Sequence, residues 1–500
     1  MKKLYTQKKF SRLAIVLISC ITALSLLLYA CKKPTDGIKI LLDSTSLFPS
    51  PTLVKFTNAD TISNGQLPAS FAVAISGPGA KYVQMASGGT DFKVTSGLLS
   101  LALTKDAHAS VTNPITFTVT ASLTGYAPIT QNITITKNDL SIYPVKVLEY
   151  AHPPVGTTVL SVENNGLTAG ALTSAYALTT SKTATMNEQA TITFAAGTQM
   201  QDANGVALGG TKLLSNIVQY GTGTDASMQA FPGGLNAPLA YKSDNTQIAG
   251  GVTFVTAGLL QMNLEASGVP VKKFSKPVSV SIELNSNMVN FATFATIQVG
   301  DKIPVWSMNE TTGQWTNELD ATVVLDGNGR KAAQFSINHL SCWNLDWSYG
   351  ANFGTYTTCT NTLSVTVNPS DPAFKGGPYE ITLQTPSGQY LGALHSATIS
   401  QGFVATFPSV PNIPLAKIVV SGGIPYARVQ SNTFSPCGAG GVTVTMPVGT
   451  NNPINVNIDI KGICSGKDIV ILPSATFELY QQTGGSIAQG TGIFADAGTF

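Results

Sequence analysis

The side chains that could do chemistry gather in one tryptophan-rich stretch, residues 299–347. It holds His339, Ser341 and Asp346, which are the side-chain types of a nucleophilic triad. A triad needs its nucleophile on a strained turn and its base supplied from another part of the fold. His339 and Ser341 instead alternate along one expected strand, and Gly-x-Ser-x-Gly occurs nowhere in the chain. We therefore predict a structural role for His339 and no catalytic residue.

Acidic side chains near Trp315 suggest a second kind of chemistry, the binding or cleavage of sugars. Glu310, Glu318 and Asp320 flank this tryptophan. Paired carboxylates beside an aromatic ring occur in glycosidases, and exposed aromatic rings stack on sugars. Acids on the rim of a hairpin are the commoner arrangement, so we predict no catalytic pair. Trp306 and Trp315 remain candidates for ligand stacking.

Four cysteines follow position 31, namely Cys342, Cys359, Cys437 and Cys464. In an exported protein they can form disulfides, and four cysteines allow three pairings. We favour Cys359–Cys437, because these residues open one expected sandwich and precede its last strand. Cys-x-x-Cys and His-x₃₋₅-His spacings are missing from the sequence, so we predict no metal site. The Gly-rich segments lack the Lys-Ser/Thr of a phosphate loop, so we expect no cofactor.

The N-terminus carries an export signal. Residues 1–12 are basic, and residues 13–30 form an uncharged apolar run that ends at Cys31. Such a run could just span a membrane as an uncleaved anchor. However, Leu28-Tyr29-Ala30-Cys31 resembles the lipobox of bacterial lipoproteins, which implies cleavage before Cys31 and acylation of its thiol and new amine. Residues 1–30 are then a signal peptide, and residues 31–48 are a lipidated cysteine with its tether to membrane lipid.

The segment that starts at Cys31, CKKPTDG, resembles the start of lipoproteins from the Bacteroidota. Many of those carry several acidic residues here as a signal for surface export, whereas this chain has only Asp36. The resemblance implies an outer-membrane lipoprotein that faces the cell exterior.

The charge balance speaks against nucleic acid as a partner. Five of the 28 basic residues and none of the 26 acidic residues lie in positions 1–31, so 23 basic residues face 26 acidic ones in the rest of the chain. A nearly neutral chain without basic clusters lacks the electrostatic footprint of a nucleic-acid binder.

Composition and length predict several all-β domains. Charged residues make up only 11% of the 500 residues, while Gly (47) and Pro (27) are plentiful. Turn residues and β-branched residues favour strands over helices. At roughly 150 residues per domain, a chain of this length holds about three or four domains.

The alternating pattern in residues 49–138 predicts a first β-sandwich. Phe71, Val73 and Ile75 alternate with small residues, and Ile115, Phe117 and Val119 alternate with threonines. Alternation with one polar face is typical of half-buried antiparallel strands. The segment resembles the immunoglobulin-like or cadherin-like modules of bacterial surface proteins.

We expect residues 139–349 to form a tryptophan-rich extracellular β module of one or two subdomains. Asp326-Gly327-Asn328-Gly329 predicts a tight hairpin turn within it. ITFAAGTQMQDANG, FPGGL, IPVWSMNETTGQW and FSINHLSCWNLDW, in this order, resemble a module of proteins related to cartilage intermediate layer protein. The recurring end of that module is matched by Pro304, Trp306, Gly313, Trp315, His339, Ser341, Trp343, Asn344 and Asp346. The resemblance implies a scaffold or adhesion module rather than an enzyme.

Two further segments follow. Residues 350–448 predict another β-sandwich, with alternation at Leu363, Val365 and Val367. Residues 449–500 resemble the start of a carboxypeptidase-regulatory-like sandwich that is incomplete at Phe500.

The sequence therefore predicts tandem antiparallel β-sandwich domains after a lipoprotein signal peptide. We expect a non-enzymatic, lipid-anchored scaffold or adhesion module of the cell envelope. The alternative is a glycan-binding surface lipoprotein that feeds a neighbouring transporter or enzyme. Its partners, besides membrane lipid, would be a glycan or another surface protein.

Overall fold

The computed structural model describes residues 49–448, except 61–66, 139–140, 351, 355–356, 373, 375–378, 397–398, 408 and 423–426, together with five short strands outside this range. These strands are β1 (Ile40–Leu42), β36 (Gly462–Ile463), β37 (Ile469–Ile471), β38 (Ala475–Tyr480) and β39 (Ala488–Phe494). The predicted signal peptide, the predicted acylation site Cys31, Cys464 and most of the predicted partial sandwich 449–500 lie outside the described residues.

The chain divides into two compact units. One comprises residues 1–47, 456–474 and 494–500, and within it β1 pairs in parallel with β37, which pairs antiparallel with β36. The other comprises residues 48–455 and 475–493 and holds all elements described below.

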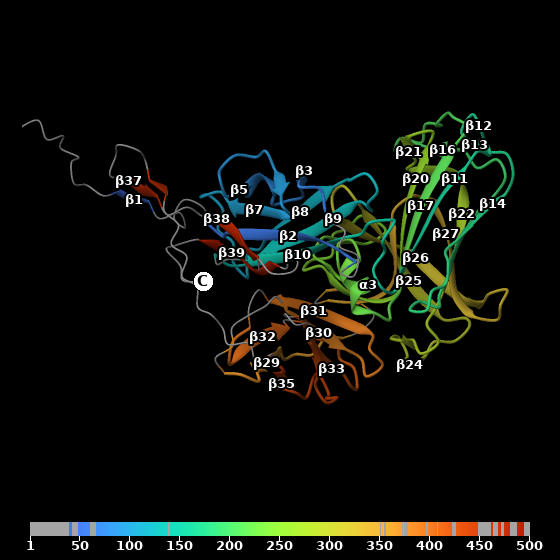
Figure 1. The fold of residues 1–500 in the computed structure, drawn as a ribbon. Coiled ribbons are helices and arrows are strands. Elements are labelled where there is room, and N and C mark those ends of the chain that lie inside the picture. Colours follow the sequence, from blue (N-terminus) through green and yellow to red (C-terminus); the bar gives the residue numbers. More distant parts are fainter. Residues whose placement is uncertain are drawn as a thin grey trace, which may run out of the picture. The chain divides into compact units, whose positions relative to one another are not determined.

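The second unit is almost entirely β, as the sequence predicts (Figure 1). Its described helices are short, a 3₁₀ turn at Ala80–Tyr82 and α3 (Asp225–Ala230). Within the described ranges no helix is long and apolar enough to cross a lipid bilayer.

The first sandwich packs two sheets around one core. One sheet has the order β10-β2-β7-β6-β3 with β5 beside β7, and the other has the order β4-β8-β9. Phe117, Leu99 and Ile133 are fully buried between them. The strands are β2 (Thr52–Asn58), β3 (Ser70–Ala72), β4 (Ala74–Ser76), β5 (Val83–Met85), β6 (Lys93–Thr95), β7 (Leu98–Leu103), β8 (Ile115–Ala121), β9 (Ile129–Ile135) and β10 (Ser141–Val147).

The end of this sandwich lies further along the chain than the predicted boundary at residue 138. β10 pairs in parallel with β2 over seven residues, from Ser141↔Thr52 to Val147↔Asn58. Val145 and Val147 are buried in the same core as β2. The sequence does not reveal this boundary, because a parallel edge strand has the same alternating pattern as the first strand of a following domain.

The tryptophan-rich module is built on one long sheet with the strand order β11-β17-β20-β28-β25-β26-β27-β22-β15-β14. Leu160 of β11 and Tyr176 of β14 pack against the same core, so the sheet is rolled around it (Figure 1). The long strands are β11 (Thr157–Asn164), β14 (Tyr176–Thr179), β15 (Ala190–Phe194), β17 (Leu213–Tyr220), β20 (Val252–Ala266), β22 (Lys273–Glu283), β25 (Lys302–Asn309), β26 (Gln314–Leu325), β27 (Lys331–His339) and β28 (Cys342–Tyr349).

Eight short strands among the described residues accompany this sheet. They are β12 (Leu167–Thr168), β13 (Ala171–Leu172), β16 (Met200–Gln201), β18 (Asn236–Ala237), β19 (Ala240–Tyr241), β21 (Val269–Pro270), β23 (Val289–Asn290) and β24 (Ala295–Thr296). Of these, β16, β18, β19 and β21 pair with the sheet, while β12 pairs with β13 and β23 pairs with β24 in two separate two-stranded sheets. The predicted hairpin turn at 326–329 is confirmed, since it joins the antiparallel pair β26 and β27, and Gly329 has the positive φ of +76° that such a turn needs.

The second sandwich spans residues 363–446. One sheet has the order β32-β29-β35 and the other has the order β31-β30-β33-β34. Leu363, Val365 and Val367 are fully buried, as their alternation predicts. The strands are β29 (Leu363–Pro369), β30 (Tyr379–Gln384), β31 (Tyr390–Ser396), β32 (Phe403–Phe407), β33 (Lys417–Gly422), β34 (Ala427–Gln430) and β35 (Gly441–Met446).

Candidate functional site

The four tryptophans lie in the two cores on either face of the rolled sheet. Trp343 and Trp347 lie in its interior, and Trp306 and Trp315 lie in a second core on its outer face. Phe254 stands between the latter two, with ring centroids 5.1 Å from Trp306 and 5.0 Å from Trp315. These aromatic rings therefore stabilise the module by burial and edge-to-face packing.

The prediction that Trp306 and Trp315 stack on a ligand is wrong. Both side chains are 0% exposed, so no sugar ring can reach them. The sequence could not show this, because the alternating pattern of β25 and β26 does not reveal that loops and α3 cover the outer face of the sheet.

His339 does not meet a nucleophile. Its Nε2 atom lies 3.3 Å from Glu318 Oε1, and Ser307 Oγ donates a hydrogen bond to the same carboxylate oxygen at 2.6 Å. In a triad the histidine stands between the acid and the hydroxyl, whereas here the carboxylate stands in the middle. The hydrogen bond from His339 holds the pKa of Glu318 below its usual range, which makes this carboxylate a poor base.

The other two residues of the suspected triad lie elsewhere. Ser341 Oγ donates to the Met308 carbonyl oxygen at 2.6 Å, and Asp346 is fully buried on β28, which β25 and β26 separate from the His339 strand β27. The ring of His339 instead packs on Trp343 with centroids 4.8 Å apart. His339 thus contacts the Glu318 carboxylate on one side and the Trp343 ring on the other.

The most extensive polar site was not predicted. The turn between β25 and β26, residues 309–313, docks on the outer face of β4, β8 and β9 in the first sandwich. Four successive carbonyl oxygens, those of Glu310, Thr311, Thr312 and Gly313, each accept a hydrogen bond of 2.8 Å from a side chain of that face. The four donors, in the same order, are Thr130, Ser76, Thr118 and Asn132.

The face that receives this turn is buried, and the fit around Gly313 is close. Thr118, Thr130 and Asn132 are 0%, 3% and 7% exposed, although they occupy the polar face that alternation would assign to solvent. Gly313 has a φ of +66°, and a Cβ atom there would lie 2.2 Å from Asn132 Oδ1. Only glycine fits both the backbone conformation and the space at this position.

A partly buried carboxyl group, that of Glu310, extends from the docked turn towards Gln261. Glu310 Oε1 accepts a hydrogen bond from Gln261 Nε2 at 3.3 Å, and Gln261 Oε1 accepts one from the Tyr220 hydroxyl at 3.0 Å. Burial raises the pKa of Glu310, while Lys272 and Gln261 act in the opposite direction. The network connects the turn to β17 and β20 in the module.

A second polar contact joins α3 to the second sandwich. Asp225, in the first turn of α3, accepts hydrogen bonds from the Tyr390 hydroxyl at 2.5 Å and from Arg428 Nε at 2.9 Å. Gln229, on the same helix, donates to the buried Glu380. Burial raises the pKa of Glu380 to about 7. The module thus makes side-chain contacts with the sandwich on each side of it in sequence.

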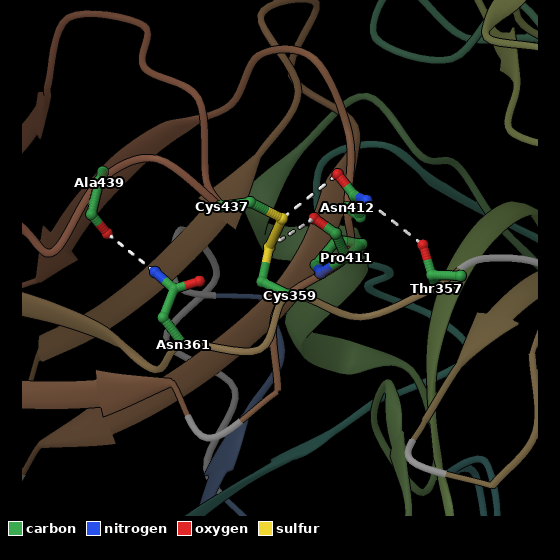
Figure 2. The surroundings of a disulfide bond; sticks show 7 residues. All are labelled: Thr357, Cys359, Asn361, Pro411, Asn412, Cys437 and Ala439. Carbon is green, nitrogen blue, oxygen red and sulfur yellow. Dashed lines mark hydrogen bonds between the residues drawn. A yellow bond between two sulfur atoms is a disulfide. The ribbon is translucent and has the colours of Figure 1, made fainter.

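Cys359 and Cys437 are joined by a disulfide, the pair that the sequence analysis favours (Figure 2). The bond ties the segment before β29 to the segment before β35, 78 positions apart. Around it, Asn412 Nδ2 donates to Thr357 Oγ1 at 3.4 Å, and Asn361 Nδ2 donates to the Ala439 carbonyl oxygen at 3.3 Å. Cys342 is a buried free thiol.

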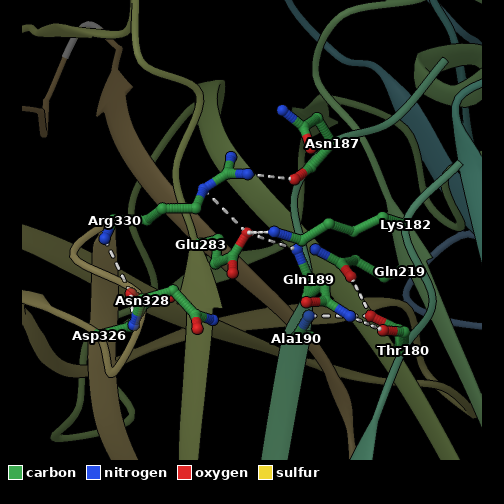
Figure 3. Close-up of polar contacts among 10 residues, drawn as sticks. All are labelled: Thr180, Lys182, Asn187, Gln189, Ala190, Gln219, Glu283, Asp326, Asn328 and Arg330. Atoms are coloured by element: carbon green, nitrogen blue, oxygen red, sulfur yellow. Dashed lines mark hydrogen bonds and ion pairs between the residues drawn. The ribbon is translucent and has the colours of Figure 1, made fainter. Parts of the chain in front are cut away.

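An ion cluster ties the predicted hairpin to β22 and to the loop before β15 (Figure 3). Glu283 Oε2 lies 3.1 Å from Arg330 Nε and 3.3 Å from Lys182 Nζ, and it accepts a hydrogen bond from the Gln189 backbone N–H at 3.2 Å. Because these groups satisfy one another, the cluster holds the fold together and offers no open coordination or reactive position.

One small cavity lies among the described residues. A cavity of about 20 Å³ lies among β9, β10 and α3, lined by Lys146, Tyr220 and Gln229 among others. That volume holds roughly one water molecule. Over the part of the chain that the structure describes, no three His, Cys, Asp or Glu side chains are grouped as metal ligands.

The fold is that of an all-β protein of several antiparallel sheets. No protein-family model matches the chain. No curated protein matches it either.

Solved structures resemble it only distantly. The Bacillus anthracis TIE protein has 9% identity and a TM-score of 0.14, over 80% of this chain and 51% of that one, so the chain spans about half of its length. BcpA, the major pilin subunit of Bacillus cereus, has 10% identity and a TM-score of 0.14, over 80% and 98%. A tetra-tandem repeat from the extending region of a large adhesion protein has 10% identity and a TM-score of 0.10, over 77% and 99%.

Proposed function

We propose that this chain is a non-enzymatic, lipid-anchored protein of the cell envelope that serves as a surface scaffold or adhesion module. The observation that carries the proposal is the docked turn. A scaffold must hold neighbouring domains in fixed relative positions. Four side-chain hydrogen bonds to consecutive carbonyl oxygens fix the first sandwich to the module. The polar side chains of this face serve that contact instead of a reaction.

The anchor in this proposal rests on the sequence around Cys31. Cleavage before this residue and acylation would tether the chain to the outer membrane, with the sandwiches facing the cell exterior. Each buried methylene of an acyl chain contributes about 0.8 kcal/mol, so several chains hold a protein of this size firmly. The resemblance of residues 28–37 to Bacteroidota lipoproteins supports this placement.

The alternative function, glycan binding, has no exposed tryptophan among its candidate stacking residues Trp306 and Trp315. The tryptophans that could stack on sugar are buried, and the cavity near α3 has room for one water molecule. No contact among the described residues favours a glycan over a protein partner.

Two experiments test the proposal. Cells grown with labelled palmitate should incorporate label into the wild-type protein and not into Cys31→Ser, and external protease should degrade the protein on intact cells. Label that persists in the variant would refute the anchor, and protection from the protease would refute surface display. A glycan array probed with residues 32–500 should remain silent, and saturable binding to one glycan class would instead support the alternative.

A further inference from the structure

The first and last strands of the first sandwich lie side by side and run in the same direction (Figure 1). These strands, β2 and β10, pair in parallel from Ser141↔Thr52 to Val147↔Asn58. The chain therefore enters the pair at Thr52, at one end, and leaves it after Val147, at the opposite end. Tension applied along the chain would pull the two strands past each other, in the direction of their own axes.

A strand pair resists this direction of load better than any other. The backbone hydrogen bonds of a parallel pair are evenly spaced along the strands. When the load acts along the strands, these bonds share it and must fail together. When the load acts at one end and across the strands, the bonds break one after another. Forced unfolding is governed by the unfolding rate, so a pair whose bonds share the load slows it.

Further hydrogen bonds close both ends of the β2–β10 pair. At the entry end, Ser50 Oγ donates to the Lys137 carbonyl oxygen at 3.0 Å. At the exit end, the Ala59 backbone N–H donates to the Val147 carbonyl oxygen at 2.8 Å. Val54 and Val147, one from each strand, are fully buried in the same core. Water therefore cannot reach the pair from its core side.

The second sandwich repeats this arrangement and adds a covalent bond. Its strands β29 and β35 also pair in parallel, beginning at Ser364↔Gly441. The disulfide between Cys359 and Cys437 lies just before the N-terminal ends of both strands. Tension that arrives at Cys359 passes through the S–S bond to Cys437 and on into β35. The segment that the two cysteines enclose, with a sequence separation of 78, therefore stays outside the path of the load.

The tryptophan-rich module is connected differently. Thr157, where the chain enters the sheet on β11, lies opposite Tyr220 on β17. The same row continues through Leu259 on β20 to Asn344 on β28. Because β28 runs on from there to Tyr349, the entry and the exit lie at the same end of the sheet. Tension would separate the edge strand β11 from β17 one bond at a time, beginning at Thr157.

We propose that this protein carries tension along its chain, with the β2–β10 pair as a mechanical clamp and the disulfide as a bypass around the second sandwich. The proposal rests on the proposed function for the source of the load. A chain tethered near Cys31 and held by a partner further along is pulled through β2 and β10. Any partner bound beyond residue 148 loads this clamp in the same direction, whereas only a load applied beyond Cys437 uses the bypass.

Single-molecule force spectroscopy, with the chain held by handles at its two ends, tests the clamp. Each unit is recognised by the length that it releases, roughly 330 Å from Thr52 to Val147 and roughly 670 Å from Thr157 to Tyr349, at about 3.5 Å per residue. We expect the shorter step to need at least about twice the force of the longer one, because only the β2–β10 bonds share the load. A shorter step at an equal or lower force would overturn the clamp.

A change of pulling direction is the matched control, because it leaves the fold intact. Val111 is 83% exposed, so a handle attached there does not disturb the core. Thr52 lies opposite Leu101, near the end of β7, so a pull between the N-terminus and residue 111 separates β2 from β7 beginning at one end. The first sandwich should then unfold at less than about half the force, since the bonds break in turn. Equal forces in the two directions would show that β2 and β10 form no clamp.

Reduction tests the bypass. With the disulfide intact, the chain between Cys359 and Cys437 should release no length. A reductant should add a step of roughly 270 Å, for a sequence separation of 78 at about 3.5 Å per residue. The variant Cys359→Ser/Cys437→Ser should show this step without reductant. The same step in the oxidised wild type would refute the bypass.

These readings are independent of the lipid anchor. Palmitate label that persists in Cys31→Ser would refute the anchor and leave the measured forces as they are. A clamp that fails in force spectroscopy would refute the tension-carrying role and leave the labelling result as it is. The two proposals therefore fail separately.

Discussion

Asn132 Nδ2 donates a hydrogen bond to the Gly313 carbonyl oxygen at 2.8 Å, across 181 positions of the sequence. Thr118 Oγ1 lies 2.8 Å from Asn132 Oδ1, and its one proton is shared between this oxygen and the Thr312 carbonyl oxygen, which is also 2.8 Å away. The amide is therefore held from both ends, with Thr118 fixing its orientation and Gly313 receiving its donor. This pair fixes the turn between β25 and β26 on the first sandwich more specifically than a hydrophobic contact could.

Gly313→Ala should weaken this contact. The variant needs a left-handed backbone conformation, which costs about 1–2 kcal/mol, and its Cβ atom would meet Asn132 Oδ1 at 2.2 Å and Thr118 Cγ2 at 2.7 Å. We expect the free energy of unfolding to fall by roughly 3 kcal/mol in urea, monitored by tryptophan fluorescence.

Gly329→Ala is the matched control for this prediction. Gly329 also has a positive φ, of +76°, but a Cβ atom there would have no neighbour within 4 Å. This variant should lose only the backbone contribution of about 1–2 kcal/mol. Equal losses in the two variants would mean that the space around Gly313 does not matter and that the docked turn contributes little.

The strands of the first sandwich could be predicted from the sequence, but the use of their polar face could not. Ile115, Phe117 and Val119 alternate with threonines, and they are buried as expected. The residue types of Thr118 and Asn132 do not show whether these side chains bind water or a distant carbonyl group. Only the fold brings residues 309–313 to that face. Alternation in the sequence therefore predicts the strand but not the segment that contacts its polar face.

The tryptophans show a similar limit to what can be predicted from the sequence. Their concentration in residues 299–347 predicts a well-packed core, and the structure has one there. Which tryptophan faces solvent depends on what covers the outer face of the sheet, and α3 and the segments around β18 and β19 come from far earlier in the chain. Hence the fold class was predictable, whereas the ligand-stacking role of Trp306 and Trp315 was predicted wrongly.

Loss of the disulfide should destabilise the second sandwich selectively. Cys359 and Cys437 close a loop with a sequence separation of 78 residues. A disulfide across a loop of this length lowers the entropy of the unfolded chain and thereby stabilises the folded state by about 4 kcal/mol. We expect Cys359→Ser/Cys437→Ser to unfold this sandwich at a lower temperature in calorimetry, with the transition of the tryptophan-rich module unchanged. A reductant should shift the wild type by the same amount and leave the double variant unaffected. A shift of all transitions together would contradict a local role.

Glu380 should make stability depend on pH. Its carboxyl group is buried, and burial raises its pKa from 4.5 to about 7, with Asp225 adding to the rise and Gln229 and Lys146 opposing it. The folded state therefore binds this proton more tightly than the unfolded state does. Its contribution to stability is fully present below pH 4.5 and is lost as the pH rises towards 7, by an upper limit of about 3 kcal/mol.

The variant Glu380→Gln checks this sign. Glutamine stays neutral and keeps an oxygen that can accept from Gln229, so the variant should match the wild type near pH 4.5 and exceed it in stability at pH 8. Urea midpoints measured across this range provide the comparison. A wild type that becomes more stable between pH 5 and 7, relative to the variant, would show that Glu380 is held in its charged form.

Glu283→Gln should cost more stability than the same change at an exposed ion pair. The Glu283 side chain is 6% exposed and faces both Arg330 and Lys182, so neutralising it leaves two cations without their common partner. Those cations are themselves partly exposed, at 26% and 34%, which limits the expected loss to about 2 kcal/mol. Glu163→Gln is the control, because Glu163 and Lys212 are 47% and 56% exposed and lie 2.9 Å apart. That variant should lose less than about 0.5 kcal/mol in urea unfolding. If the two variants lost equally little, solvent would screen the Glu283 cluster, and the hairpin at residues 326–329 would be held by its turn alone.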